Sequence, residues 1–301
     1  MTAHDTDRGK ALPMLALLAG NAALALGPWL VRLADTGPVA AGFWRVALAL
    51  PLVALIALAN RQALTSHSPR LTGLALAGGV FFGFDIAAWH LGIGETRLAN
   101  AVLFGNAGSV VLMCWAFIAL RRLPQGREWP AIIAALTGAA ILLGRSLEIA
   151  QSNFIGDLFC LLAGLLYAGY LLTAQDARKV MGGWAVLTWA GMASALVLLG
   201  TALVLGETIM PRDWTPLLIL AFSSQIVGQG LLVYALRHFS PLIIGIALLT
   251  QPAVAAAVGW WRFDEILLPL DFLGIALVGS ALVLARMAQP KVLAAKPPEP
   301  A

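Results

Sequence analysis

Six polar side chains lie near the middle of long apolar segments of this sequence. They are Asn21, Asp85, Asn106, Tyr167, Gln225 and Gln251. A polar group that faces hydrocarbon is costly, and an Asp near a helix centre costs about 2.5–3.5 kcal/mol on insertion scales. Such groups therefore face other helices or a water-filled cavity, where they can bind a small polar solute. The amides can also join neighbouring helices without binding a ligand, so both roles are open.

Asp85 is the acid that lies deepest in an apolar segment. A carboxylate in this position either stays protonated or finds a cation. Three roles are open: a proton relay, a counter-charge for a substrate ammonium group, and a structural ion pair with Arg45. His90 follows five residues later, so its side chain does not stack with that of Asp85 on one helix face.

Aromatic and amide side chains accompany these positions. Phe82 and Trp89 flank Asp85, and Gln225 and Gln229 lie four residues apart on one helix face. One acid among aromatic rings suits a small zwitterion with an apolar body better than a phosphate, which requires clusters of Arg and Lys. The expected substrate-binding set is Asn21, Phe82, Asp85, Trp89, His90, Asn106, Tyr167, Gln225, Gln229 and Gln251.

Three further residues are expected to act in structure or gating. Pro28 and Pro252 lie inside apolar segments, where proline removes a helix hydrogen bond and can kink the helix. Arg45 lies near the end of its segment. We expect neither a metal nor a cofactor, because the sequence contains no ligand spacing or cofactor motif of a known type.

The composition places these segments in a membrane. Hydrophobic residues make up 60% of the 301-residue chain and charged residues only 11%, whereas about a quarter of the residues in soluble domains are charged. About 20 apolar residues form a helix that crosses a bilayer, and ten such segments occur. They span roughly residues 13–32, 39–59, 71–93, 98–120, 129–147, 155–175, 184–206, 215–236, 240–262 and 266–286. The expected fold class is an all-α integral membrane protein with ten transmembrane helices.

Basic residues in the short connections indicate the orientation. If both termini are cytoplasmic, six of the 19 Lys and Arg residues lie outside or within the membrane, and every lysine lies inside. The six are Arg32, Arg45, Arg97, Arg145, Arg212 and Arg262. We therefore expect cytoplasmic tails at residues 1–11 and 287–301. The second tail is expected to be disordered because it is short, polar and rich in proline.

The chain contains an internal repeat at a spacing of 145 residues. Gly83, Leu91, Leu103, Trp115, Pro124 and Ala131 recur as Gly228, Leu236, Leu248, Trp260, Pro269 and Ala276, and Trp44 recurs as Trp189. The expected units are residues 12–147 and 148–286, with five segments each. Because five is odd, the second unit enters the membrane from the opposite side, which predicts two inverted five-helix repeats around a central cavity.

Several short motifs carry a family resemblance. They are Phe43-Trp44-Arg45, Tyr234-Ala-Leu-Arg-His-Phe-Ser, Gln251-Pro252, Gly259-Trp-Trp and Asp264-Glu265. The chain resembles, over residues 12–286, the EamA type of the drug/metabolite transporter superfamily, and within it the YddG-type aromatic amino acid exporters of bacterial inner membranes. The first copy departs from the pattern, since Asp264-Glu265 aligns with Ala119-Leu120. The resemblance implies a central cavity, export from the cytoplasm, and a last helix of each half that packs away from the pathway.

The expected function is export of small metabolites across the bacterial inner membrane by alternating access, either secondary active or facilitative. The expected substrates are aromatic or neutral amino acids. The alternatives are a cationic drug or quaternary ammonium compound, held by cation–π contacts, and a nucleoside or sugar. An enzyme is not expected, because the chain lacks a phosphate-binding loop and hydrolase motifs. The expected partners are an amino acid-like substrate and the lipid bilayer but not nucleic acid, and the chain is expected to act as a monomer or homodimer.

Overall fold

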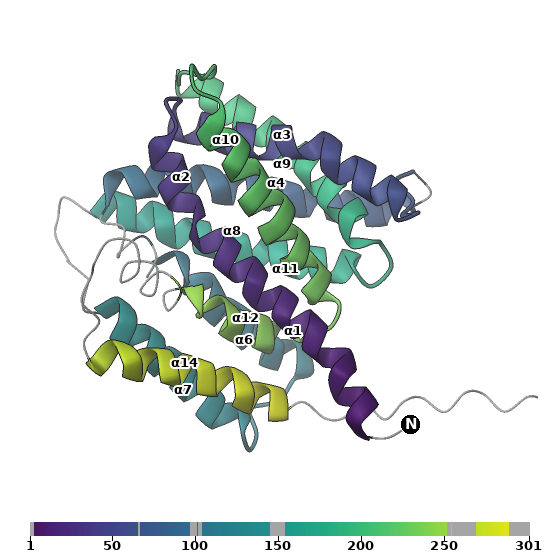
Figure 1. Ribbon diagram of the computed structural model, residues 1–301, viewed down its shortest axis with the longest axis vertical. Helices are drawn as coiled ribbons and strands as arrows, with labels where there is room; N and C mark the ends of the chain where they lie inside the picture. Colours follow the sequence, from purple (N-terminus) through teal and green to yellow (C-terminus); the bar gives the residue numbers. More distant parts are fainter. Residues whose placement is uncertain are drawn as a thin grey trace, which may run out of the picture.

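The computed structural model describes residues 3–65, 67–96, 101, 104–144, 154–251, 254 and 269–288. Helices joined by short connections make up this part of the chain, and no strand occurs in it (Figure 1). The helices are α1 (Ala3–Ala25), α2 (Gly27–Leu33), α3 (Pro38–Ala59), α4 (Pro69–Glu95), α6 (Ala107–Leu120), α7 (Glu128–Gly144), α8 (Phe154–Ala177), α9 (Gly183–Val204), α10 (Thr215–Leu220), the π-helix η2 (Ala221–Gly228), α11 (Gln229–Leu236), α12 (Pro241–Leu248) and α14 (Pro269–Ala288). The expected all-α class is confirmed.

Six segments of the described chain are long and apolar enough to cross a membrane, judged by length and composition. They are Leu12–Val31, α3, α4, α8, α9 and Thr215–Leu236. The other four expected segments contain the helices α6, α7, α12 and α14, which are not among these six. Each expected segment thus contains a helix, while ten membrane crossings remain a prediction.

Two of the expected segments are interrupted helices. α1 ends at Ala25 and α2 begins at Gly27, with Pro28 in its first turn, where the missing N–H of proline breaks no helix hydrogen bond. The segment that begins at Thr215 passes through α10, η2 and α11, and a π-helical turn within a helix often marks a functional site. Pro28 therefore starts a new helix instead of kinking a continuous one, and Pro252 lies outside the described residues.

α3 and α9 pack against each other with matching contacts at their two ends. The carboxylate of Glu207, which follows α9, accepts hydrogen bonds from the backbone N–H groups of Val39 (3.2 Å) and Ala40 (2.7 Å) at the start of α3. The side-chain oxygen of Gln62, which follows α3, accepts one from the N–H of Ala185 (3.1 Å) near the start of α9. Each helix is therefore capped by the residue that follows the other, so the two helices run antiparallel.

Two tryptophan side chains form a second pair of reciprocal contacts between the same two regions. The indole Nε1 of Trp44 donates to the carbonyl oxygen of Ile209 (2.6 Å), and the indole Nε1 of Trp189 donates to that of Leu64 (2.9 Å). Trp44 and Trp189 are 145 residues apart in the sequence, as are Leu64 and Ile209. Contacts that are exchanged in this way are what a two-fold relation between two units produces.

We expect Glu207→Ala to lower the free energy of unfolding by about 1–2 kcal/mol, because two N–H groups at the start of α3 lose their acceptor. Thermal unfolding of the purified protein in detergent measures the change. Asp176→Ala is the control, since the Asp176–Lys179 ion pair is exposed and such pairs contribute little. Equal unfolding temperatures for the two variants would contradict the capping role of Glu207.

Glycines permit the closest helix crossings in the bundle. A Cβ atom at Gly108 on α6 would collide with the carbonyl oxygen of Gly164 on α8, and one at Gly79 on α4 would collide with that of Ala190 on α9. Small residues at such crossings let helix backbones approach each other in membranes. By contrast, α7 and α14 pack together at one edge of the bundle (Figure 1), and neither lines the cavity described next.

Candidate functional site

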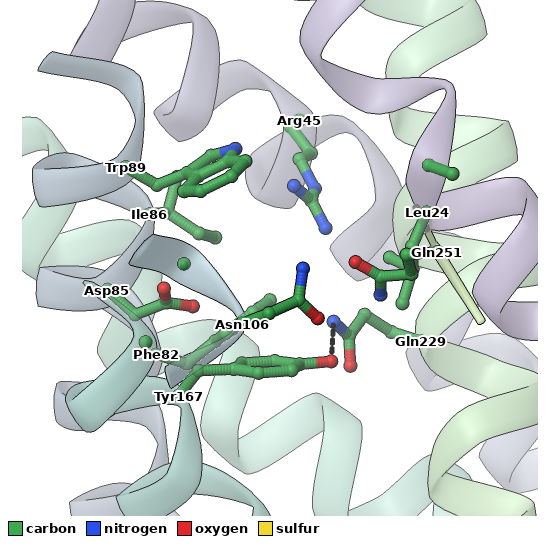
Figure 2. A pocket seen from close by; sticks show the side chains of 13 residues that line it. Leu24, Arg45, Phe82, Asp85, Ile86, Trp89, Asn106, Tyr167, Gln229 and Gln251 are labelled. Carbon is green, nitrogen blue, oxygen red and sulfur yellow. Dashed lines mark hydrogen bonds between the residues drawn. The ribbon is translucent and has the colours of Figure 1, made fainter. Parts of the chain in front are cut away.

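A cavity of about 120 Å³ lies among helices from both expected repeats. Side chains from α1, α3, α4, α8 and α11 line it, together with residues that precede α6 and follow α12 (Figure 2). Seven of the expected binding residues are in this lining: Phe82, Asp85, Trp89, Asn106, Tyr167, Gln229 and Gln251. Arg45, expected to act in structure or gating, also lines the cavity. The structure thus brings together polar residues that lie as far apart in the sequence as Arg45 and Gln251.

Three expected binding residues lie outside this lining. Asn21 is buried, and its Nδ2 donates to the carbonyl oxygen of Ala247 (2.7 Å), which joins α1 to α12. Nδ1 of His90 lies 2.6 Å from the carbonyl oxygen of Pro38 and joins α4 to the start of α3. Gln225 is buried in η2. Asn21 and His90 therefore act between helices in this structure, and for Asn21 this is the alternative role that the sequence left open for the amides.

Among the described lining residues, the two ionisable acidic and basic side chains come from neighbouring helices. Arg45 projects from α3 and Asp85 from α4, and both are buried. The guanidinium of Arg45 lies over the ring of Phe82, with its Cζ 5.8 Å from the ring centroid. No ion pair joins Arg45 to Asp85 in the described part of the chain. The structural ion pair, one of the three roles left open for Asp85, is therefore not formed in this structure.

A chain of hydrogen bonds ends at the cavity. The hydroxyl of Tyr170 donates to Oε1 of Gln229 (3.3 Å), and Nε2 of Gln229 donates to the hydroxyl of Tyr167 (3.3 Å; Figure 2). Tyr170 is fully buried and stacks on Phe82 with ring centroids 4.5 Å apart. Because the Tyr167 oxygen accepts from Gln229, its own proton is left for a hydrogen bond to a group in the cavity.

Part of the lining escapes sequence reasoning. Leu24, Ile86, Gly105 and Gly164 line the cavity, yet leucine, isoleucine and glycine are common throughout an apolar chain and carry no chemical signal. Gly164 alone has a usable signal, because Leu17-Leu18-Ala19-Gly20 recurs as Leu161-Leu162-Ala163-Gly164 at a spacing of 144 residues. The sequence also gives no reason to place the Arg45 side chain in the cavity instead of at the end of its segment.

Comparison with known proteins agrees with this architecture. Residues 154–287 match the EamA-like transporter family. The chain is 26% identical over 288 residues to the threonine/homoserine exporter RhtA of Escherichia coli (strain K12), covering 94% of this chain and 95% of that protein. It is 26% identical over 202 residues to the uncharacterized transporter YwfM of Bacillus subtilis (strain 168), covering 65% of this chain and 67% of that protein.

A solved crystal structure supports the fold. It superimposes with a TM-score of 0.74 at 12% sequence identity and covers 92% of this chain and 96% of its own. RhtA is an exporter by name and YwfM a transporter by name. Neither of them identifies the YddG-type subgroup. Residues 154–287 therefore match the EamA-like transporter family, and the chain is similar to RhtA over most of its length and to YwfM over about two thirds of it.

Proposed function

We propose that the protein exports small neutral amino acids from the cytoplasm across the bacterial inner membrane. The observation that carries the proposal is the buried cavity, in which a cation, Arg45, and an anion, Asp85, lie among aromatic and amide groups. A neutral amino acid carries both charges and needs a counter-charge for each. Similarity to a threonine/homoserine exporter supports hydroxylated amino acids as the first candidates.

The hydrogen-bond chain that ends at Tyr167 also supports a hydroxylated substrate. The hydroxyl proton of Tyr167 needs an acceptor in the cavity, and the side-chain hydroxyl oxygen of threonine or homoserine provides one. A site built to hydrogen-bond a hydroxyl discriminates against the analogue that lacks it, because its buried polar group is then left unpaired. The expected selectivity is therefore for threonine and homoserine over valine.

Aromatic amino acids are the second candidate. The rings of Phe82, Trp89 and Tyr167 line the cavity and provide apolar surface for such a side chain. A cationic drug has less support, because Arg45 places a positive charge in the same cavity. A nucleoside or sugar would leave both Arg45 and Asp85 without a counter-charge, at a cost in binding free energy.

We further propose that transport occurs by alternating access between two inverted repeats, residues 12–147 and 148–286, with ten membrane crossings and cytoplasmic tails. The exchanged contacts of Trp44 and Trp189 support the two-fold relation. So do the helix pairs: α4 packs on α8 as α1 packs on α11, while α3 pairs with α9, α6 with α12 and α7 with α14. Two such units around a central site can exchange inward-open and outward-open shapes.

Labelling of single cysteines tests this topology. In a chain with Cys114 and Cys160 replaced by serine, we expect Arg212→Cys to react with a membrane-impermeant maleimide in intact cells, and Thr65→Cys to react only after permeabilisation. Both positions are exposed, so access depends on the side of the membrane. Reaction of both variants in intact cells would contradict the inverted arrangement, since Thr65 and Arg212 would then lie on the same side.

Efflux from reconstituted vesicles tests the function. Vesicles that contain the purified protein and radiolabelled threonine, homoserine or phenylalanine are diluted into buffer with and without a pH gradient. We expect threonine and homoserine to leave these vesicles faster than they leave protein-free vesicles. An efflux rate that changes with the pH gradient indicates proton-coupled export, and an unchanged rate indicates facilitative export. Absence of efflux and counterflow for every amino acid would contradict the proposal and favour a membrane scaffold that does not transport.

A further inference from the structure

Two buried ionisable side chains, one basic and one acidic, face the cavity without pairing with each other. Arg45 is 8% exposed and Asp85 is 9% exposed, and both line the same space. Figure 2 shows the guanidinium of Arg45 at one end of this space, the carboxylate of Asp85 at its side, and Tyr167 and Gln229 at the other end. The charges are close enough to interact through space, yet no ion pair forms between them in the described part of the chain.

Hydrogen bonds from the described residues do not compensate these charges. Nε of Arg45 is buried without a hydrogen-bond partner, and the guanidinium lies instead over the ring of Phe82. No described residue donates a hydrogen bond to the carboxylate of Asp85. A buried charge that lacks a counter-charge is costly, so a ligand that supplies one counter-charge to each group is strongly favoured here.

We infer that Arg45 binds the carboxylate and Asp85 the ammonium group of one amino acid, which bridges the two side chains. This inference rests on the proposed function and identifies the atoms that recognise the substrate. The planar guanidinium donates paired hydrogen bonds that match the two oxygens of a carboxylate. The Asp85 carboxylate accepts hydrogen bonds from an ammonium group, which has only donors.

This charge clamp, Arg45 and Asp85, requires both charges on the ligand. An amine binds Asp85 but leaves Arg45 uncompensated, and a carboxylic acid does the reverse. The ring of Phe82 holds the guanidinium over the cavity through a cation–π contact, which fixes where the carboxylate binds. On this inference the amino acid side chain occupies the other end of the space, where Figure 2 shows Tyr167 and Gln229.

Competition binding tests the clamp. Purified wild-type protein in detergent is titrated with radiolabelled threonine against unlabelled threonine, threoninol, which lacks the carboxylate, and 3-hydroxybutyrate, which lacks the ammonium group. We expect each analogue to bind at least about tenfold more weakly than threonine, which corresponds to about 1.4 kcal/mol. In Arg45→Gln, the ratio of the affinity for threonine to that for threoninol is expected to fall to near one. In Asp85→Asn, the ratio of the affinity for threonine to that for 3-hydroxybutyrate is expected to fall in the same way.

Charge-retaining variants guard against a purely structural effect. Arg45→Lys and Asp85→Glu keep the charges. Both variants are expected to bind threonine more tightly than either analogue, even if the affinity for threonine falls. Equal binding of threonine and both analogues by the wild-type protein would overturn the clamp, whether or not the variants fold. Loss of all three ligands by the same factor in the neutral variants would also overturn it. A wild-type protein that binds neither threonine nor phenylalanine would instead contradict the proposed function itself.

Discussion

Replacing Tyr167 with phenylalanine is expected to lower threonine export about tenfold while changing valine export little. The hydroxyl of Tyr167 receives a hydrogen bond from Gln229 and has its own proton left for the substrate. Removing it leaves a buried polar group on bound threonine unpaired, at a cost of about 1–3 kcal/mol, and 1.4 kcal/mol is a factor of ten. Valine has the shape of threonine without the hydroxyl and loses nothing. Efflux of the two amino acids from vesicles with equal amounts of protein measures the ratio.

Tyr170→Phe is the matched control for this experiment. Tyr170 lies one helical turn from Tyr167 on α8 and donates to the same Gln229 (3.3 Å), but it does not line the cavity. Loss of its hydroxyl is expected to lower stability by about 1 kcal/mol and to leave the threonine/valine export ratio close to that of the wild type. An equal fall in threonine and valine export in Tyr167→Phe would contradict recognition of the substrate hydroxyl.

Replacing Gly108 with valine is expected to reduce the amount of folded transporter and its export activity at least tenfold. Gly108 lies where α6 crosses α8, and a Cβ atom there would collide with the carbonyl oxygen of Gly164. The obstacle is backbone, which cannot rotate away as a side chain can, so the helices must separate. Overpacking of a core usually costs about 1–3 kcal/mol, and here it also displaces Gly105 and Asn106 from the cavity wall. Size-exclusion chromatography and vesicle efflux measure the two effects.

Gly94→Val controls for the poor helix propensity of valine. Gly94 lies in α4, and apart from its chain neighbours and the backbone of its own helix, no heavy atom of the described residues lies within 4 Å of the position that its Cβ would occupy. We expect this variant to fold and to export nearly as well as the wild type. A Gly108→Val protein that matches Gly94→Val in both yield and export would show that the close contact of α6 and α8 is not required.

Helix positions were predictable from the sequence because apolar length is a direct consequence of bilayer thickness. Each of the ten expected segments contains a helix, including the segment of α10, η2 and α11. The π-helix and the break before Pro28 were not predictable, because they depend on which backbone groups neighbouring helices satisfy. The caps formed by Gln62 and Glu207 were also missed. Both residues follow a helix at equivalent repeat positions, so the repeat contained a signal for them.

The types of residue in the candidate site were predictable from the sequence, but which individual residues line the cavity was not. Seven of the expected binding residues line the cavity, because deep polar groups avoid lipid whatever their role. Asn21 and His90 meet the same condition through the carbonyl oxygens of Ala247 and Pro38. Depth in the membrane therefore does not separate a residue that joins helices from one that faces a cavity.

The sequence by itself predicted a helical membrane protein with a duplicated unit and a few polar residues near the centre of the bilayer. The reason is that the thickness of the hydrocarbon sets the length of the apolar segments. Its exclusion of unpaired polar groups keeps polar residues in them few. The tertiary structure alone decided that Arg45 and Asp85 face one cavity without pairing, and that Gln229 orients Tyr167. These outcomes depend on how each helix is rotated about its axis. Backbone contacts at positions such as Gly108 and Gly164 set that rotation. Glycine is common throughout the apolar chain, so the sequence does not show which glycines lie at a helix crossing.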